Sequence, residues 1–125
     1  MREVSEDDVK CVLAAVGELP QLQRLMLGGQ AIAPCVRALV EAVVDRAWLR
    51  ELTLYNTPVG DDGAGHLAAM LERNRSLLVL NAGGCKIGDA GLERLGTALT
   101  RNTTLRYLDM MRNRFTAKGV SRFAS

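Results

Sequence analysis

Three glycines and a lysine near Cys85 are residue types from which a phosphate-binding loop could be built. Such a loop requires Gly-x-x-x-x-Gly-Lys-Ser/Thr, in which backbone amides surround the phosphates and the lysine contacts them. In Gly83-Gly84-Cys85-Lys86 the lysine comes too early, and Gly88, five residues after Gly83, is followed by Asp89. A second glycine pair, Gly28-Gly29, has no lysine beside it. The spacing therefore predicts backbone bends and no nucleotide site.

His66, the one histidine of the chain, and three of the aspartates are the next candidates for chemistry. A single histidine supplies neither a nucleophile–base pair by itself nor a three-histidine metal site. Asp61, Asp62 and Asp89 could bind a cation, but each stands where a helix is predicted to begin, and a carboxylate there accepts hydrogen bonds from free backbone amides. We therefore interpret these aspartates as helix caps and His66 as a surface residue, and we expect no catalytic, cofactor-binding or metal-binding residue.

The cysteines and two asparagine motifs carry less specific signals. Cys11, Cys35 and Cys85 form no Cys-x-x-Cys pair, and an odd, scattered set favours reduced thiols inside a cell. Asn74-Arg75-Ser76 and Asn102-Thr103-Thr104 match the acceptor pattern for N-glycosylation. Both lie between a predicted helix and the next predicted strand, and the acidic start of the chain lacks the apolar core of a signal peptide. We interpret both motifs as turns.

Charge and hydropathy argue against nucleic-acid and membrane partners. The formal net charge is +2, with acids and bases interspersed along the sequence, whereas a nucleic-acid-binding domain usually clusters its basic residues on one face. No apolar run approaches the roughly 20 residues of a membrane span. Aromatic residues make up only 4% of the chain, so the core must be built from Leu, Val, Ala and Met. These features predict an intracellular globular protein.

A repeated phrase is the strongest signal in the sequence. It begins at Leu22, Leu49, Leu77 and Leu105 and reads LQRLML, LRELTL, LLVLNA and LRYLDM, at intervals of 27 or 28 residues. The spacing Leu-x-x-Leu-x-Leu predicts a short strand whose alternate side chains point into a core. A helical apolar pattern follows the strand in the second and third units. One strand and one helix cannot bury their own apolar faces, so we expect the units to stack around a shared core.

A polar or thiol side chain recurs eight residues after each starting leucine. These residues are Gln30, Thr57, Cys85 and Asn113. The strand turns away from its neighbours at this place and leaves backbone groups that no strand pairs, and such a side chain can satisfy them. We therefore predict that these four residues form a structural ladder that runs from repeat to repeat.

These columns together resemble the leucine-rich repeat family, and in particular its ribonuclease-inhibitor-like class with repeats of about 28 residues. The resemblance covers residues 22–125. The sequence departs from the family pattern at Cys35-Val36, where Gly-Leu is usual, at Gln30 in the ladder, and at Ala82, where leucine is usual. The resemblance implies an α/β solenoid, a horseshoe segment with a parallel sheet on its concave face and helices on its convex face.

We expect a single leucine-rich repeat domain over residues 1–125. Its repeats start at positions 22, 49, 77 and 105, and the last one is incomplete. Residues 1–21 match only the helical half of a unit, which predicts a capping helix over the first full repeat. The last helical pattern stops before its final apolar position, so we expect further repeats or another chain to cover the C-terminal edge.

The resemblance implies a non-catalytic protein–protein interaction module or scaffold subunit that binds a protein partner, within a larger assembly, through its concave face. The family includes ribonuclease inhibitors, innate immune sensors, actin-end caps and axonemal scaffolds, but the positions that contact partners are not shared motifs. An alternative is a regulator of a small GTPase, of the GTPase-activating type, which some members of this repeat class are. The residues expected to bind on the concave face are Arg24, Met26, Glu51, Thr53, Tyr55, Val79, Asn81, Tyr107, Asp109 and Met111.

Overall fold

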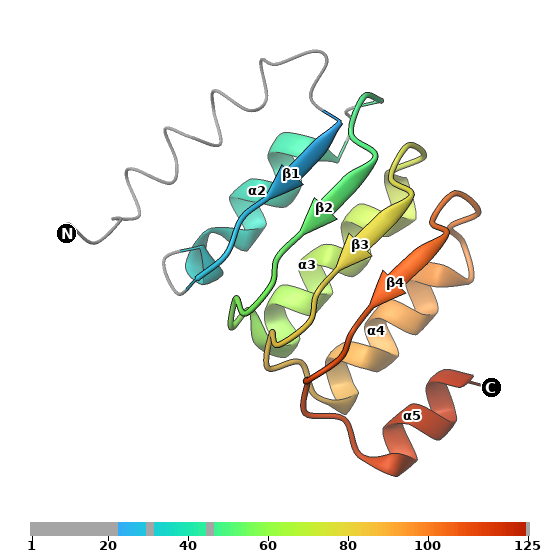
Figure 1. Cartoon of the computed structure of the whole chain (residues 1–125). Helices are drawn as coiled ribbons and strands as arrows, with labels where there is room; N and C mark the ends of the chain where they lie inside the picture. The colour runs from blue at the N-terminus through green and yellow to red at the C-terminus, as the bar shows by residue number, and fades with distance from the viewer. Residues whose placement is uncertain (1–22, 30–31, 45–46, 125) are drawn as a thin grey trace, which may run out of the picture.

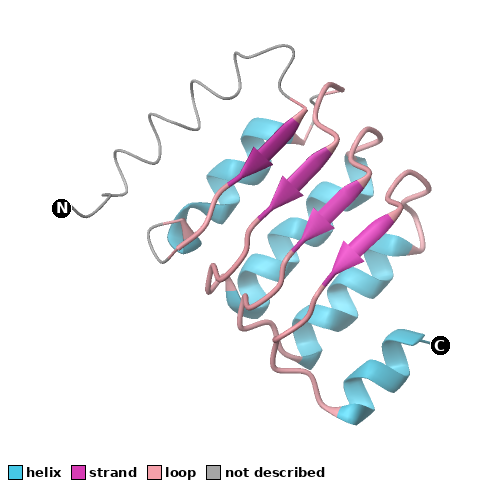
Figure 2. Ribbon diagram, viewed as in Figure 1, coloured by secondary structure: helices cyan, strands magenta, loops and turns pink. Residues whose placement is uncertain are grey.

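The computed structural model describes residues 23–29, 32–44 and 47–124, in which strands and helices alternate along the chain (Figure 1; Figure 2). The strands are β1 (Arg24–Met26), β2 (Glu51–Thr53), β3 (Val79–Asn81) and β4 (Tyr107–Asp109). The helices are the 3-10 helix η1 (Ala33–Cys35) and the α-helices α2 (Val36–Val43), α3 (Gly60–Arg73), α4 (Asp89–Leu99) and α5 (Ala117–Ala124). The capping helix expected over residues 1–21 lies outside the described residues, as does Gln30.

The four strands form one parallel sheet in the order β1-β2-β3-β4. The register places the central leucines of the strands side by side, with Leu25 opposite Leu52, Leu52 opposite Leu80, and Leu80 opposite Leu108. Helices α2, α3 and α4 lie in a second layer that covers one face of the sheet (Figure 1). This arrangement confirms the predicted α/β solenoid with a parallel sheet and a helical outer layer.

The core lies between the sheet and the helices, and it is built from the repeated apolar columns. Leu52, Leu54 and Leu80 are fully buried, and the helices α3 and α4 bury Leu67 and Leu95 against them. Burial on this scale is the main term that stabilises such a fold, at about 1.5–3 kcal/mol for each fully buried leucine side chain. The stacked repeats therefore share one continuous core.

The spacing Leu-x-x-Leu-x-Leu also predicts a buried Leu108, and the structure corrects this prediction. The side chain is only half-buried and packs at the border of the core. Its strand, β4, is the last in the described sheet and pairs with β3 alone. A leucine of this column is covered by its own helix and by both neighbouring repeats, so a strand at the edge of the sheet buries it incompletely.

The aspartates at the helix starts act differently from the prediction. Helix α3 begins at Gly60, so Asp61 lies within its first turn, and no side chain caps that helix. The Oδ1 atom of Asp61 instead accepts hydrogen bonds from the backbone amides of Gly88, at 2.7 Å, and Gly91, at 3.0 Å. Both amides belong to the start of α4, so Asp61 caps the helix of the following repeat.

The same cross-repeat cap recurs one unit later. Asp89 accepts hydrogen bonds from the backbone amide of Thr116, at 2.9 Å, and from its hydroxyl. The Thr116 hydroxyl in turn accepts a hydrogen bond from the Gly119 amide at 3.2 Å, so Thr116 caps α5. These contacts also explain the glycine column, because a Cβ atom would lie 2.7 Å from the Asp61 carboxylate at Gly91 and 2.0 Å from the Asp89 carboxylate at Gly119.

Candidate functional site

Both glycine amides of the pair after β3 are already hydrogen-bonded within the protein. The Gly84 amide donates to the Met111 carbonyl at 2.9 Å, and the Gly83 amide donates to Asn81 Oδ1 at 3.1 Å. Gly84 has a φ of 67°, a left-handed conformation that glycine adopts at little cost. The loop is a bend whose backbone groups are committed to the same and the next repeat.

The described ladder residues bond to the backbone that the strands leave unpaired. Cys85 Sγ donates to the Leu54 carbonyl of the preceding repeat at 2.9 Å, and Asn113 Nδ2 donates to the Ala82 carbonyl at 2.9 Å. Asn113 Oδ1 also accepts from the Cys85 amide at 3.0 Å. Thr57 differs, because its hydroxyl bonds within its own repeat, to the Tyr55 carbonyl at 3.3 Å.

Cys85 is placed as a structural thiol. Its side chain is fully buried, and burial raises the pKa of the thiol, although a hydrogen bond with the Thr57 backbone opposes this. Because the thiolate is the nucleophilic form of cysteine, a raised pKa and full burial both suppress reactivity. The cysteine therefore supplies a hydrogen bond and packing at this site.

A second ladder lies at the opposite ends of the strands, and the sequence reasoning recognised its residues only as turns. Asn74, the C-cap of α3, accepts hydrogen bonds from the backbone amides of Ser76, at 2.9 Å, and Leu77, at 2.8 Å, and donates to the Val44 carbonyl at 3.1 Å. Asn102 repeats the pattern one unit later. With 3% exposure and both amide atoms bonded, Asn74 is closed to glycosylation. The recurrence of asparagine three residues before the starting leucine was the signal that could have predicted this ladder.

The sheet face away from the helices carries large exposed side chains. Met26 is 77% exposed, Met111 67%, Tyr107 58% and Tyr55 39%. Among the described residues these are four of the six large hydrophobic side chains that are exposed. Arg24 is also exposed. Of the other five predicted residues, four are half-buried, namely Glu51, Val79, Asn81 and Asp109, and Thr53 is buried.

Thr53 departs from the expectation that it is available to a partner, because it is only 7% exposed. It lies at the end of β2, between Met26 of β1 and Asn81 of β3 in the sheet register. Both neighbours are longer side chains than threonine, and β2 is flanked by a strand on each side. A short side chain in a central strand is covered by its neighbours, so Thr53 contributes little to the exposed surface.

Several contacts hold the exposed side chains of this face in place. Arg24 Nε donates to Glu51 Oε2 at 2.7 Å across β1 and β2, and this hydrogen bond and the charge of the carboxylate raise the pKa of the guanidinium. Tyr55 lies against Gly83, where an added Cβ atom would be 3.1 Å from the ring. Asp109 Oδ1 accepts from the Met111 amide at 3.0 Å and fixes the turn after β4. The Arg24–Glu51 pair, the Tyr55 ring and the turn after β4 are therefore positioned before any partner binds.

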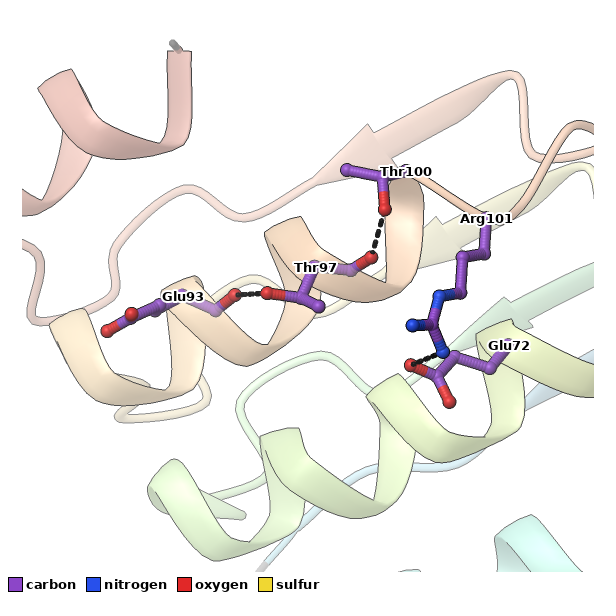
Figure 3. A network of polar contacts seen from close by, with 5 residues as sticks. All are labelled: Glu72, Glu93, Thr97, Thr100 and Arg101. Carbon is purple, nitrogen blue, oxygen red and sulfur yellow. Dashed lines mark hydrogen bonds and ion pairs between the residues drawn. The ribbon is translucent and has the colours of Figure 1, made fainter.

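The outer helical face has a different character. On α4, the Thr97 hydroxyl donates to the Glu93 carbonyl at 3.1 Å and the Thr100 hydroxyl donates to the Thr97 carbonyl at 2.6 Å (Figure 3). Arg101 forms an ion pair with Glu72 of α3 at 3.7 Å (Figure 3). These polar groups are bonded within the helical layer, and surface ion pairs of this kind are worth about 0–1 kcal/mol.

Histidine, cysteine and carboxylate side chains are scattered over the part of the chain that the structure describes. That part contains no group of three or more His, Cys, Asp or Glu side chains arranged to hold a metal ion. His66 is half-buried on α3. None of the described helices combines the length and the apolar character that crossing a bilayer requires.

Comparison with known proteins agrees with the geometry. A family model described as Leucine Rich repeat matches residues 73–96 and 101–124. Leiomodin-1 Actin-Binding Site 2 has a similar structure, with a TM-score of 0.80 and 22% identity over 94% of this chain and 69% of that one. The tropomodulin C-terminal domain of Caenorhabditis elegans has a TM-score of 0.71 and 17% identity over 94% of this chain and 89% of that one. Identities this low indicate a shared fold. The repeat spacing is consistent with the ribonuclease-inhibitor-like class, residues 73–96 and 101–124 match leucine-rich repeats, and the chain has the leucine-rich repeat fold.

Proposed function

We propose that this chain is a non-catalytic interaction module that binds a protein partner through its concave sheet face. The observation that carries the proposal is the concentration of exposed Met26, Tyr55, Tyr107 and Met111 on that face. Contiguous exposed apolar groups mark interaction surfaces, and tyrosine and methionine are enriched in protein interfaces.

The chemistry of the face supports a partner with an apolar centre and a polar border. Tyr107 and Met111 would supply the apolar contacts, and tyrosine loses little conformational entropy on binding. The Arg24–Glu51 pair lies on the β1 side, where it can exchange its mutual hydrogen bond for bonds to a partner. Hydrogen-bonded strands beneath these side chains reduce the cost of ordering the surface when a partner binds.

The structural relatives suggest the first protein to test. One of them is titled an actin-binding site, so purified monomeric actin is a natural probe for this chain. The proposal itself concerns the concave face and a protein partner, and actin is the more specific hypothesis within it.

The test uses a double variant of the concave face, Tyr107→Ala with Met111→Ala. Binding of the wild type and the variant is measured to immobilised actin and, in parallel, by quantitative mass spectrometry of proteins captured from native extract. If these side chains include a hot spot, the loss is about 2 kcal/mol or more, roughly a thirtyfold weaker affinity. Thr97→Ala, on the convex face, is the matched control and should bind as the wild type does.

Two results would contradict the proposal. One is a partner that the concave double variant captures as well as the wild type, and the other is a partner lost in the Thr97→Ala control or in Glu93→Ala. If the wild type does not bind actin, only the actin hypothesis is removed. A GTP-hydrolysis assay with purified small GTPases distinguishes the interaction module from the alternative, a GTPase-activating regulator. The interaction module should leave the rate of GTP hydrolysis unchanged.

A further inference from the structure

The two loops that follow β3 and β4 carry basic residues and no acidic ones. Residues 82–88 contain Lys86, residues 110–116 contain Arg112 and Arg114, and neither stretch contains Asp or Glu. The corresponding loops after β1 and β2, residues 27–32 and 54–59, contain no charged residue. Positive charge in these loops is therefore confined to the third and fourth repeats.

Backbone hydrogen bonds hold the two basic loops side by side beyond the carboxyl ends of β3 and β4 (Figure 1). The Gly84 amide donates to the Met111 carbonyl at 2.9 Å, and the Arg114 amide donates to the Ile87 carbonyl at 2.8 Å. Lys86 precedes Ile87, and it holds the same position in its repeat as Arg114 does, nine residues after the starting leucine. The side chains of Lys86 and Arg114 therefore leave adjacent parts of the backbone.

The ladder residues fix the backbone from which three basic side chains project. Cys85 is fully buried and precedes Lys86. Asn113 is half-buried between Arg112 and Arg114, and its Oδ1 atom accepts a hydrogen bond from the Cys85 amide at 3.0 Å. Lys86, Arg112 and Arg114 are all exposed. We call these three side chains the basic cluster.

The basic cluster is not neutralised by ion pairs. No ion pair in the described part of the chain involves any of its three side chains. The carboxylates that contact the two loops are half-buried, and they accept hydrogen bonds from the loops themselves. Because the carboxylates are half-buried and the basic side chains exposed, the charge that a partner meets here is positive. The bonds run to Asp61 from the Gly88 amide, to Asp89 from Thr116, and to Asp109 from the Met111 amide.

Arg112 occupies a backbone position that suits other residues better. Its φ is 59°, and the same position holds Asn56, with a φ of 55°, in the second repeat and Gly84, with a φ of 67°, in the third. Glycine and asparagine adopt this left-handed conformation more readily than arginine does. Backbone stability therefore gives no reason for an arginine here, whereas contact with a partner does.

The basic cluster borders on the apolar part of the concave face. Met111, which is 67% exposed, immediately precedes Arg112. Tyr107, which is 58% exposed, lies on β4, the strand that leads into the same loop. A partner that covers Tyr107 and Met111 therefore also comes within reach of the cluster.

We propose that the basic cluster binds an acidic segment of the protein partner. This proposal rests on the proposed function, because the acidic segment belongs to the partner that covers Tyr107 and Met111. Carboxylates accept charge-assisted hydrogen bonds from guanidinium and ammonium groups, and complementary charge speeds association and fixes orientation. The segment carries Asp or Glu next to apolar residues, so that its apolar side chains lie on the concave face and its carboxylates lie on the loops.

A nucleic acid or a membrane surface fits the cluster less well than an acidic segment. A nucleic-acid backbone is neutralised by basic groups along a track, and polybasic membrane sites gather about 4–8 Lys or Arg side chains. Here the track ends after two repeats, because the loops at residues 27–32 and 54–59 are uncharged. An acidic segment of a protein needs no longer track.

The experiment selects peptides from a random library displayed on phage, with the full chain as bait. The selected peptides should be enriched in Asp and Glu next to apolar residues. The best peptide is then synthesised together with an amide form, in which each Asp is replaced by Asn and each Glu by Gln. Fluorescence anisotropy should show that the acidic form binds at least about tenfold more tightly, and the difference should shrink as the salt concentration rises.

Variants assign the effect to the basic cluster. Arg112→Asn removes the charge and introduces the residue that the same conformation already holds at Asn56, so the fold is preserved. Arg112→Asn, Arg114→Gln and Lys86→Gln should each weaken the acidic peptide by about two- to fivefold and leave the amide form unchanged. Arg106→Gln, which removes an exposed arginine just before β4, is the matched control and should bind both peptides as the wild type does.

Three results would overturn the proposal. The acidic and amide forms bind equally, or Arg106→Gln weakens the acidic peptide as much as Arg112→Asn does. The third is that a single-stranded oligonucleotide, or vesicles that contain phosphatidylserine, bind more tightly than the acidic peptide and depend on the same three side chains.

The double variant Tyr107→Ala with Met111→Ala distinguishes this failure from failure of the concave-face proposal. It should weaken both forms of the peptide, whereas the charge variants weaken only the acidic form. If the selected peptides show no excess of acidic residues yet depend on Tyr107 and Met111, the acidic segment is wrong and the concave-face proposal stands. If the double variant binds both forms normally, the concave-face proposal fails, and the placement of the acidic segment on that partner fails with it.

Discussion

The third and fourth repeats carry the same sequence phrase but differ in how far they bury it. Leu77 is 1% exposed and Leu80 fully buried, whereas their counterparts Leu105 and Leu108 are only half-buried. The strands have the same length and adjacent registers. The difference therefore arises from neighbours, because β3 is flanked by a strand on each side and β4 on one side only.

Hydrogen bonds, like the leucines, are less buried at the fourth repeat than at the third. The Ala82 amide, just after β3, donates to the Asp109 carbonyl of the next repeat at 2.8 Å. The cap from Asp61 to α4 is part-buried, whereas the cap from Asp89 to Thr116 is exposed. In a stack where each repeat contacts only its neighbours, stability should fall toward such an edge. The expectation that further repeats or another chain cover this edge stays a prediction.

The largest expected effect is a difference between two leucine substitutions. Leu80→Ala should lower the free energy of unfolding by about 2–5 kcal/mol, because a fully buried side chain leaves a cavity. Leu108→Ala should cost less than about 2 kcal/mol, because a half-buried side chain gives up less transfer free energy. Urea denaturation followed by circular dichroism measures both values.

Equal losses in the two leucine variants would contradict the comparison between the repeats. They would mean that Leu108 is as fully covered in solution as Leu80, as it would be if another chain packed on β4. Light scattering at the same concentrations distinguishes that case. If the protein is a monomer and the two losses are equal, stability does not fall from the third repeat to the fourth.

The next effect concerns the caps that connect one repeat to the next. Asp61→Ala removes the acceptor for the Gly88 and Gly91 amides and should cost about 1–2 kcal/mol. Asp89→Ala removes an exposed cap at the edge and should cost less, on the order of 0.5 kcal/mol. Amide exchange at Gly91 is the specific readout, and protection unchanged in Asp61→Ala would show that the cap is not needed.

The repeat architecture could be predicted from this one sequence, because residues of the same type recur at the same positions of each repeat. The leucine positions predict the parallel strands, and the polar position eight residues later predicts Cys85 and Asn113 as hydrogen-bonding residues, because each of these properties depends on one repeat and its period. The missed features depend on which side chains of adjacent repeats come into contact. Asp61 caps the helix of the next repeat, and Thr53 is covered by the longer side chains of the neighbouring strands. Both features depend on the lateral offset between repeats, which one repeat by itself does not reveal.

Arg50 and Arg75, which line one pocket together, illustrate the same limit. Arg50 and Arg75 are 25 residues apart in the sequence, and only stacking of the repeats brings Arg50 to the Asn74-Arg75 turn. The net charge of this stretch of sequence does not reveal the two arginines as a pair, because acidic residues lie between them. The exposure of Tyr107 and Met111, in contrast, could be predicted from alternation along one strand and its turn.

The smallest expected effect is a dependence of the free energy of unfolding on pH. It arises from the third repeat, whose ladder residue Cys85 can ionise, and not from the fourth, whose ladder residue Asn113 cannot. Burial raises the pKa of Cys85 in the folded chain above the ordinary value of 9.0. The folded state then holds the proton more tightly than the unfolded state, so this contribution is fully present below about pH 8 and is lost as pH rises through 9 and above. The slope from one such group is at most about 1.4 kcal/mol per pH unit.

Cys85→Thr tests this dependence, because Thr57 fills the same ladder position and is fully buried there. The free energy of unfolding, measured in urea with a reductant at pH 7, 8, 9 and 10, should fall more steeply for the wild type than for the variant above pH 8. Subtraction of the two curves removes the tyrosines and lysines, which titrate in both proteins. Parallel curves across this range would show that the Cys85 thiol ionises as easily in the folded chain as in the unfolded one, and that the third repeat is less tightly closed than its leucines indicate.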